Sequence, residues 1–292
     1  MAVANANERQ HRGEHLAAAF PPLLIAAERV ANTVVQGVHG RRRTGQGETF
    51  WQFRSYAPGD PVTRIDWRAS AKATRLYVRE TEWEAAQSAW LWRDASPSMN
   101  YSSSPSLPTK RERAEILLLA LASLLLRGGE RVTLLNSAEP PGTGRAALAR
   151  LAHRLEQDSP SLADYELVPR HGQIVLIGDL LSPLFEIEAL IQRFAQRGTR
   201  GHLLQILDPA EATLPFNGRV RFEGLEGEAP LLMSRAEAVR EAYIEKLAHH
   251  RQGLAETARM AHWTVATHHT DAPPQHALLG LYNALTAERG VG

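Results

Sequence analysis

A carboxylate and two hydroxyl groups occupy every second position directly after a strongly apolar stretch of the chain. Asp94, Ser96 and Ser98 follow the run SAWLWR at 88–93. In an extended loop, residues two apart point the same way, so these three oxygen-bearing side chains converge. Hard oxygen ligands of this kind suit Mg²⁺ or Mn²⁺. The spacing alone favours the simpler alternative, in which Asp94 and Ser96 only cap a following helix. The apolar strand before the loop, the long helix after it and Asp179 at a second strand end raise the case for a divalent-cation site.

Two further residues are candidate ligands for the same ion. Asp179 ends the β-branched run at 173–178, and Thr143 lies in the Pro- and Gly-rich loop at 140–144. Ligands of open parallel sheets bind at the carboxyl ends of strands, near the switch in strand order. With few direct carboxylates, such an ion would stay electrophilic and keep a position for an outside carboxylate. We therefore predict a metal site with these ligands: Asp94, Ser96, Ser98, Thr143 and Asp179.

The elements that must position these residues alternate between β and helical patterns from position 88 onward. Apolar and β-branched runs predict strands at 88–94, 131–136, 173–179, 201–208 and 262–269, with a short one at 219–224. Helical spacing predicts helices at 110–127, 145–156, 184–196, 234–260 and 276–288. We expect the fourth of these to be capped by Ser234, with Glu237 three residues on. The alternation predicts an α/β fold with a mostly parallel sheet and helices on both faces.

The first 86 residues have a different pattern. Apolar residues at helical spacing predict a helix within 16–38, broken early by Pro21-Pro22. Aromatic and β-branched residues between 50 and 82 predict a small antiparallel β segment, with a type II turn at 57–60. We therefore expect two regions, an N-terminal helix and β-rich segment at 1–86 and the main domain at 87–292.

Composition excludes several classes of site. The chain has no cysteine, so thiolate zinc sites, iron–sulfur clusters and disulfides are excluded. The longest apolar run, 116–126, is shorter than the ~20 residues that span a bilayer, and the N-terminus has no apolar signal segment. The net charge of +1 gives no global attraction to nucleic acid. We expect a cytoplasmic protein without a membrane span and without nucleic acid as partner.

Other motifs in the sequence give weaker evidence for a binding or catalytic site. The loop at 140–145 resembles part of a phosphate-binding loop, but Glu139, Arg145 and Ala146 stand where that motif needs Gly, Lys and a hydroxyl. The histidine pairs 249–250 and 268–269 are poor chelators, because adjacent side chains diverge. Two alternative functions stay open: a Mg²⁺-dependent hydrolase or phosphotransferase at the same acidic strand ends, and nucleic-acid binding through Arg41–Arg43.

Upstream of the predicted site, the stretches RSYAPGD at 54–60 and RIDWRASA at 64–71, followed by Arg79-Glu80, carry a specific resemblance. They resemble the signature of the bacterial family called domain of unknown function 58, in which such a segment precedes a von Willebrand factor A-like domain. That fold is a Rossmann-like three-layer sandwich. Its metal-ion-dependent adhesion site uses Asp-x-Ser-x-Ser, then a Thr, then an Asp from three loops. The resemblance implies these roles for Asp94, Ser96 and Ser98, then for Thr143, then for Asp179.

This resemblance also implies a function, and it raises a question about the charge of Arg93. Members of the family are often encoded beside MoxR-type AAA+ ATPases, which implies an adaptor or accessory to such a machine. We therefore expect a non-enzymatic, divalent-cation-assisted protein-interaction module with bound Mg²⁺ or Mn²⁺. Arg93 stands beside the predicted ion where the fold usually has an apolar residue. It would either repel the ion or be neutralised by Glu80 or Glu82.

Overall fold

The structure, a computed structural model of the 292-residue chain, describes residues 22–38, 50–57, 65–72, 75–81, 87–156, 168–170 and 172–287. The chain forms two compact units, one of residues 1–41 with 87–292 and one of residues 42–86. Among the described residues, no helix is both long and apolar enough to cross a membrane.

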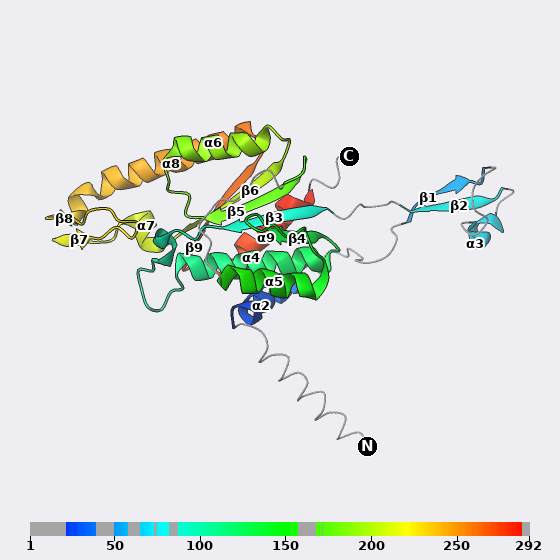
Figure 1. The fold of residues 1–292 in the computed structure, drawn as a ribbon, viewed down its shortest axis with the longest axis horizontal. Coiled ribbons are helices and arrows are strands. Elements are labelled where there is room, and N and C mark those ends of the chain that lie inside the picture. Colours follow the sequence, from blue (N-terminus) through cyan, green and yellow to red (C-terminus); the bar gives the residue numbers. More distant parts are fainter. Residues whose placement is uncertain are drawn as a thin grey trace, which may run out of the picture. The chain divides into compact units, whose positions relative to one another are not determined.

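The larger unit is built on a parallel sheet of five strands in the order β4-β3-β5-β6-β9 (Figure 1). Their bounds are β3 Ser88–Arg93, β4 Arg131–Leu134, β5 Gln173–Gly178, β6 Arg200–Leu207 and β9 Thr264–His269. Every neighbouring pair in this sheet runs parallel. Helices cover both faces, so the predicted three-layer α/β class is confirmed.

Two hydrophobic cores hold the layers together, one on each face of the sheet. In β3, Ala89 and Leu91 point to one core, whereas Trp90 and Trp92 point to the other, as the pleat requires. One face packs against α4 (Lys110–Arg127), α5 (Gly144–Glu156) and α9 (Pro274–Ala287), and α2 (Pro22–Val38) packs on α4 and α9 and shares their core. The other face packs against α6 (Leu184–Ala195) and α8 (Arg240–Met260), which lie together in Figure 1.

Helix α4 is the central helix of the first layer. Its start is fixed by a capping box, in which the Thr109 hydroxyl accepts from the Glu112 amide and the Glu112 carboxylate accepts from the Thr109 amide. Gly129, with φ of 84°, follows its end, in a conformation that favours glycine. Leucines and alanines fill nearly the whole circumference of the helix between these ends, so it is buried on almost all sides.

The chain order of the strands creates a switch point between β3 and β5. After β3 the chain adds β4 on one side, and it then returns to add β5 on the other side. Loops that leave neighbouring strands in opposite directions open a crevice at the carboxyl edge of the sheet. Asp94 and Asp179 are the residues that directly follow β3 and β5. The topology therefore brings both carboxylates to the switch point.

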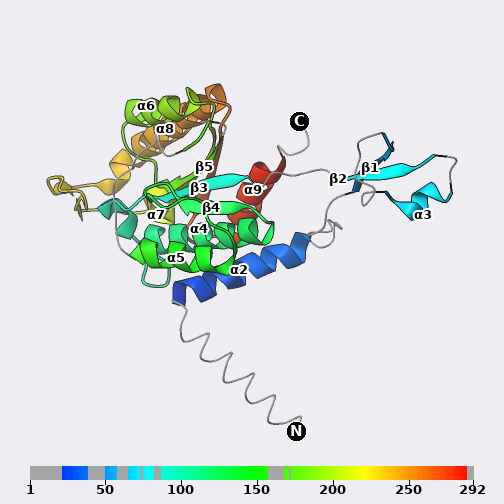
Figure 2. The same ribbon diagram turned by 45° about the vertical axis from the view of Figure 1, so that its right-hand side comes forward.

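Helix α2 belongs to the larger unit. It lies against α4 and α9, alongside the helical layer in Figure 2, with Leu24, Ala27, Ala31 and Val34 buried in the same core as α4. Glu28 also pairs with Arg127 at the end of α4. The predicted grouping of residues 1–86 therefore differs from the compact units, because the apolar stripe of α2 finds its cover on the main domain.

We predict that Ala31→Leu destabilises the protein by about 2 kcal/mol, because Ala31 is fully buried where α2 packs in this core and a larger side chain would overpack it. Thr33→Leu, at an exposed position of the same helix, is the matched control and should change stability little. Urea unfolding of the two variants measures the difference. Equal stabilities would show that α2 does not pack as described.

The smaller unit pairs β1 (Phe50–Ser55) with β2 (Tyr77–Thr81) in an antiparallel hairpin and carries the short helix α3 (Trp67–Ser70). The predicted antiparallel segment is therefore present, while its turn at 58–60 lies outside the described residues. Asp66 caps α3, accepting from the Ala69 amide at 2.9 Å. Trp67 is exposed.

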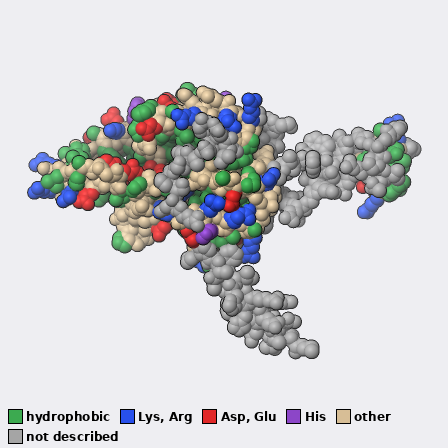
Figure 3. All heavy atoms as spheres, in the orientation of Figure 1, with side chains coloured by type: hydrophobic (Ala, Val, Ile, Leu, Met, Phe, Trp, Pro, Cys, Tyr) green, Lys and Arg blue, Asp and Glu red, His purple; other side chains and the backbone are tan. Residues whose placement is uncertain are grey.

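Two parts of the main domain differ from the sequence prediction. The loop after β6 forms helix α7 (Pro209–Thr213), and the predicted strand at 219–224 becomes β7 (Val220–Phe222), paired with an unpredicted β8 (Leu231–Met233). The hairpin carries basic, acidic and apolar side chains interspersed at one end of the domain (Figure 3). The predicted cap of the helix at Ser234 is wrong: a 3-10 turn at Ala236–Val239 comes first, and α8 begins at Arg240.

Candidate functional site at the carboxyl edge of β3 and β5

Hydrogen bonds join the loop after β3 to the end of β5. The Ser96 amide donates to Asp94 Oδ1 at 2.8 Å, and the Ser96 and Ser98 hydroxyls lie 2.9 Å apart. Ser98 then donates to Asp179 Oδ2 at 2.7 Å. Pro97 opens a short 3-10 turn that holds the two serines in this arrangement. Four of the five predicted site residues therefore meet at one edge of the sheet.

A buried lysine continues this network. Lys110, the first residue of α4, places Nζ 2.9 Å from Asp179 Oδ2 and 2.6 Å from Glu211 Oε1 on α7. Lys110 has no exposed surface, and desolvation opposes its charge. The two carboxylates outweigh that effect and raise the pKa of Lys110, so the ammonium form is held at neutral pH. The network therefore runs from Ser96 through Ser98, Asp179 and Lys110 to Glu211.

Asp94 has a different environment from Asp179. Burial is the main cause that raises the pKa of the Asp94 carboxyl, opposed by its bonds to Ser96. The negative charges of Asp179 and Glu226 raise it further. Within the part of the chain that the structure describes, Asp94 has no ion pair like the one that Lys110 makes with Asp179. An added positive charge at this position would relieve the desolvation and the repulsion together.

Thr143 does not join this group. Gly142 forms an antiparallel bridge with Val132, near the start of β4, and Val132 is level with Ala89 in β3. Asp94 lies five residues further along, or roughly 16 Å at the rise of a strand. The loop after β4 turns back along its own strand, which carries Thr143 toward the opposite edge of the sheet. The structure therefore does not bring Thr143 together with the other four predicted site residues.

Arg93 pairs with Glu115, to which the sequence did not point, while the side chains of the predicted partners Glu80 and Glu82 lie outside what the structure describes. Its guanidinium lies 2.9 Å from Glu115 of α4 and donates to the Leu155 carbonyl at 3.1 Å. It also donates to the carbonyl oxygen of Asp94 at 3.2 Å. The side chain therefore packs under α4 and α5, where its charge is paired.

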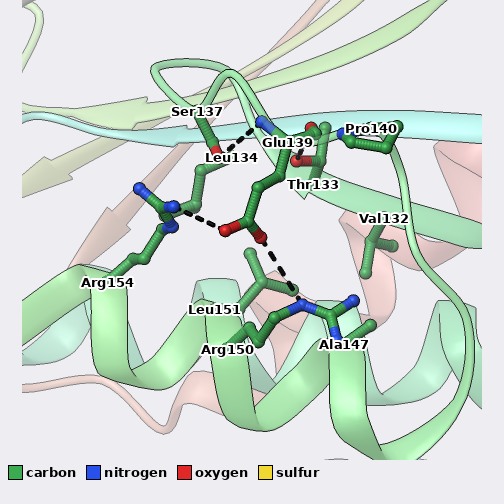
Figure 4. A pocket seen from close by; sticks show the side chains of 10 residues that line it. All are labelled: Val132, Thr133, Leu134, Ser137, Glu139, Pro140, Ala147, Arg150, Leu151 and Arg154. Atoms are coloured by element: carbon green, nitrogen blue, oxygen red, sulfur yellow. Dashed lines mark hydrogen bonds and ion pairs between the residues drawn. The ribbon is translucent and has the colours of Figure 1, made fainter.

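The loop that resembles a phosphate-binding loop borders a small cavity around Glu139. The cavity around Glu139 holds only about 20 Å³, and Glu139 binds Arg154 at 2.5 Å and Arg150 at 3.5 Å inside it (Figure 4). The hydrogen bond from Arg154 lowers the pKa of the Glu139 carboxyl, so its negative charge is held where a nucleotide phosphate would have to enter. That cavity has no room for a nucleotide.

Neither histidine pair forms a chelate. His250 bonds the Leu180 carbonyl at 2.7 Å, and His268 is buried. Within the described parts of the chain, no three His, Asp or Glu side chains gather to hold a metal ion. Arg41–Arg43 lie outside the described residues.

Sequence patterns did not point to Lys110 and Glu211, although both belong to the network. Charged residues in the first turn of a helix are usually solvated, and these two lie about a hundred residues apart. One signal was present: Lys110 is one of three lysines in a chain whose other 30 basic residues, of 33 Lys and Arg, are arginines. A flexible ammonium enters a narrow buried position more readily than the planar guanidinium fork.

Known proteins similar to this chain carry names without an assigned activity. The uncharacterized protein Rv1480 of Mycobacterium tuberculosis is 28% identical, over 84% of this chain and 81% of its own length. The uncharacterized protein Mb1516 of Mycobacterium bovis matches equally. Among solved structures, the conserved hypothetical protein BatB from Bacteroides thetaiotaomicron aligns with a TM-score of 0.43 and 16% identity, covering 70% of this chain and 100% of its own. An aerotolerance-related membrane protein from Bacteroides fragilis aligns with a TM-score of 0.40 and 17% identity, with the same coverage.

One family model matches the chain, over residues 52–253, and it is described as "Protein of unknown function DUF58". The match includes most of β1, all of β2, the loop after β3, the end of β5 and most of α8. Since it spans more than half of the sequence, the chain belongs to the DUF58 family.

Proposed function

We propose that this protein is a non-enzymatic interaction module that binds a protein partner with the help of a divalent cation, Mg²⁺ or Mn²⁺. The residues that would hold the ion are Asp94, Ser96 and Ser98. Asp179 would assist through a water molecule. The ion would supply a positive centre for a carboxylate of the partner.

The observation that carries the proposal is the spacing of the two serine hydroxyls. Ligands of Mg²⁺ lie about 2.1 Å from the ion in an octahedron, so neighbouring ligands are about 3.0 Å apart. The Ser96 and Ser98 oxygens are 2.9 Å apart, which fits one edge of that octahedron. The Asp94 carboxylate beside them is partly desolvated and repelled by Asp179, so a cation would stabilise it.

The charge balance supports an outside ligand. Asp179 Oδ2 already accepts from Ser98 and from Lys110, which leaves this oxygen little capacity for direct coordination. Thr143 lies elsewhere and adds no ligand. One direct carboxylate and two neutral hydroxyls would leave one of the ion's two positive charges unbalanced, which favours an acidic side chain from a partner.

The finer part of the proposal follows from the family resemblance. An Asp-x-Ser-x-Ser loop and a second aspartate at the switch point of a parallel sheet are the elements expected of a von Willebrand factor A-like domain. On the same ground, the partner we propose is a MoxR-type AAA+ ATPase in the cytoplasm, with this chain as its adaptor. A pull-down of that ATPase with and without EDTA would test the pairing.

Calorimetric titration with MnCl₂ and MgCl₂ tests the cation itself. The wild-type protein should bind, and Asp94→Ala should weaken binding about 30-fold or more, because the only direct carboxylate is removed. Asp271→Ala, an exposed aspartate beyond β9, is the control and should bind as the wild type does. Equal, negligible heats in wild type and Asp94→Ala would remove the metal dependence and leave the adaptor role to be tested by the pull-down.

A further inference from the structure

A lysine with no exposed surface sits at the centre of the candidate site. Lys110 Nζ contacts two acidic groups, Asp179 and Glu211, at 2.9 and 2.6 Å. Fully buried lysines are rare, because desolvation of an ammonium costs several kcal/mol unless partners repay it. An aliphatic side chain would fill this space without that cost. The charge of Lys110 therefore needs an explanation beyond packing.

We propose that Lys110 is a resident cation that keeps Asp179 out of direct contact with the divalent ion, and thereby makes the site depend on a carboxylate from the partner. This inference rests on the proposed function and assigns its regulation to a residue that the Asp-x-Ser-x-Ser pattern does not include.

Asp179 is shared between the positive ammonium of Lys110 and the neutral hydroxyl of Ser98. Its Oδ2 atom accepts from Lys110 Nζ at 2.9 Å and from Ser98 Oγ at 2.7 Å. Ser98 is a proposed ligand, so Asp179 is already one hydrogen bond from the ion's position. In this proposal the ion pair with Lys110 keeps the carboxylate from serving the ion directly, while its Oδ1 atom accepts from the Leu181 amide at 3.3 Å.

Glu211 fixes the lysine in this role. Its Oε1 atom binds Nζ, while its Oε2 atom accepts from the Asp208 amide at 2.9 Å, which anchors the carboxylate to the first turn of α7. Lys110 itself is anchored at the capped start of α4. The ammonium group is thus held from two helices and cannot swing away when an ion arrives.

The charge of Lys110 is expected to lower the affinity of the site for the divalent ion. A fixed unit charge near a divalent ion repels it, and in a partly buried site this repulsion is large. Without the lysine charge, Asp179 would become a second direct carboxylate and the repulsion would vanish. The ion would then bind more tightly and would need a partner's carboxylate less.

A double-mutant cycle on Mn²⁺ affinity tests this. Lys110→Met should tighten Mn²⁺ binding about tenfold or more, whereas Asp179→Asn alone should weaken it by less than about tenfold, because Asp179 attracts the ion only through a water molecule. The double variant should lose the gain, because the gain requires the Asp179 carboxylate. Lys246→Met, on an exposed face of α8, is the matched control and should leave the affinity unchanged. Isothermal titration with MnCl₂ measures the affinities, and thermal melting of the metal-free proteins verifies folding.

Each result decides the matter. Unchanged or weaker Mn²⁺ affinity in folded Lys110→Met overturns the inference and leaves the proposed function standing. Lys110→Gln, which keeps a neutral donor, replaces the methionine variant if that one does not fold. A loss above about tenfold in folded Asp179→Asn alone also overturns the inference, because Asp179 would then coordinate directly.

The wild-type titration separates the two proposals. If the wild type binds no Mn²⁺ but Lys110→Met does, the charge of Lys110 excludes the ion, which ends the proposed metal dependence and overturns the inference that Lys110 regulates a bound ion. If neither binds, the metal dependence and this inference both fail, and the adaptor role is left to the pull-down.

Discussion

Replacing Gly201 with alanine is expected to destabilise the protein by about 3–4 kcal/mol, as large as any single change we predict. A Cβ atom at this position of β6 would lie 2.0 Å from Cδ2 of the Trp263 ring. Trp263 is buried and its indole N–H donates to the Thr199 carbonyl at 3.1 Å, so the ring cannot withdraw without losing a hydrogen bond. Overpacking of this severity forces the strand or the ring to move.

Gly280→Ala is the matched control for that change. Gly280 lies in α9, is exposed, and has open space where a Cβ would stand. Alanine there should be neutral or stabilise the helix by up to about 1 kcal/mol. Guanidinium unfolding of both variants measures the contrast. A Gly201→Ala protein as stable as the wild type would show that Trp263 does not pack on this strand as described.

Acidification is expected to remove about 3 kcal/mol of stability through one buried histidine. Burial lowers the pKa of His268 from 6.5 to about 4, helped by the positive charges of Arg113 and His269 and opposed by Asp271. Its Nε2 atom has no hydrogen-bond partner in the described structure. Between pH 6.5 and 4 the unfolded chain takes up a proton at this residue and the folded protein does not. Stability is therefore full above pH 6.5 and falls as the pH approaches 4.

His268→Gln removes this titration. Its free energy of unfolding should fall less steeply with acid than that of the wild type, by a slope difference of about 1.4 kcal/mol per pH unit between pH 6 and 4. His276→Gln, at an exposed position of α9, should keep the wild-type slope. Urea denaturation at several pH values supplies the curves, and parallel curves for wild type and His268→Gln would contradict the expectation.

Most helices and strands of the main domain could be predicted from the sequence, because they are long and their apolar residues recur at regular spacing. Helix α4 begins and ends at the predicted residues, and β3, β5 and β6 lie where the apolar runs placed them. Their signal is strong because the strands of a covered parallel sheet are buried on both faces. The hairpin strand β8 carried no such signal, since Leu231 and Leu232 are both exposed and follow no alternation. Nor did the five-residue helix α7, which is stabilised by its capping box.

The site was predictable only as far as strand order fixes it. Asp94 and Asp179 directly follow strands, so any parallel sheet that pairs β3 with β5 brings them together. Thr143 follows a loop of several residues whose return path along β4 depends on hydrogen bonds that a sequence pattern does not encode. Lys110 and Glu211 depend on how α4 and α7 dock, and tertiary docking of charged residues has no local pattern.

The two carboxylate oxygens of Glu211 bind different partners, and this arrangement has one more consequence. One of its oxygens fastens Lys110 and the other completes the first turn of α7, whose Glu211 carbonyl in turn accepts from the Tyr243 hydroxyl on α8 at 2.7 Å. Displacing Lys110 would therefore also disturb the capping of α7 and its hydrogen bond to α8, the longest helix among the described residues. A structural change at the turn that carries Ser96 and Ser98 can therefore be transmitted through Lys110 and Glu211 to α8.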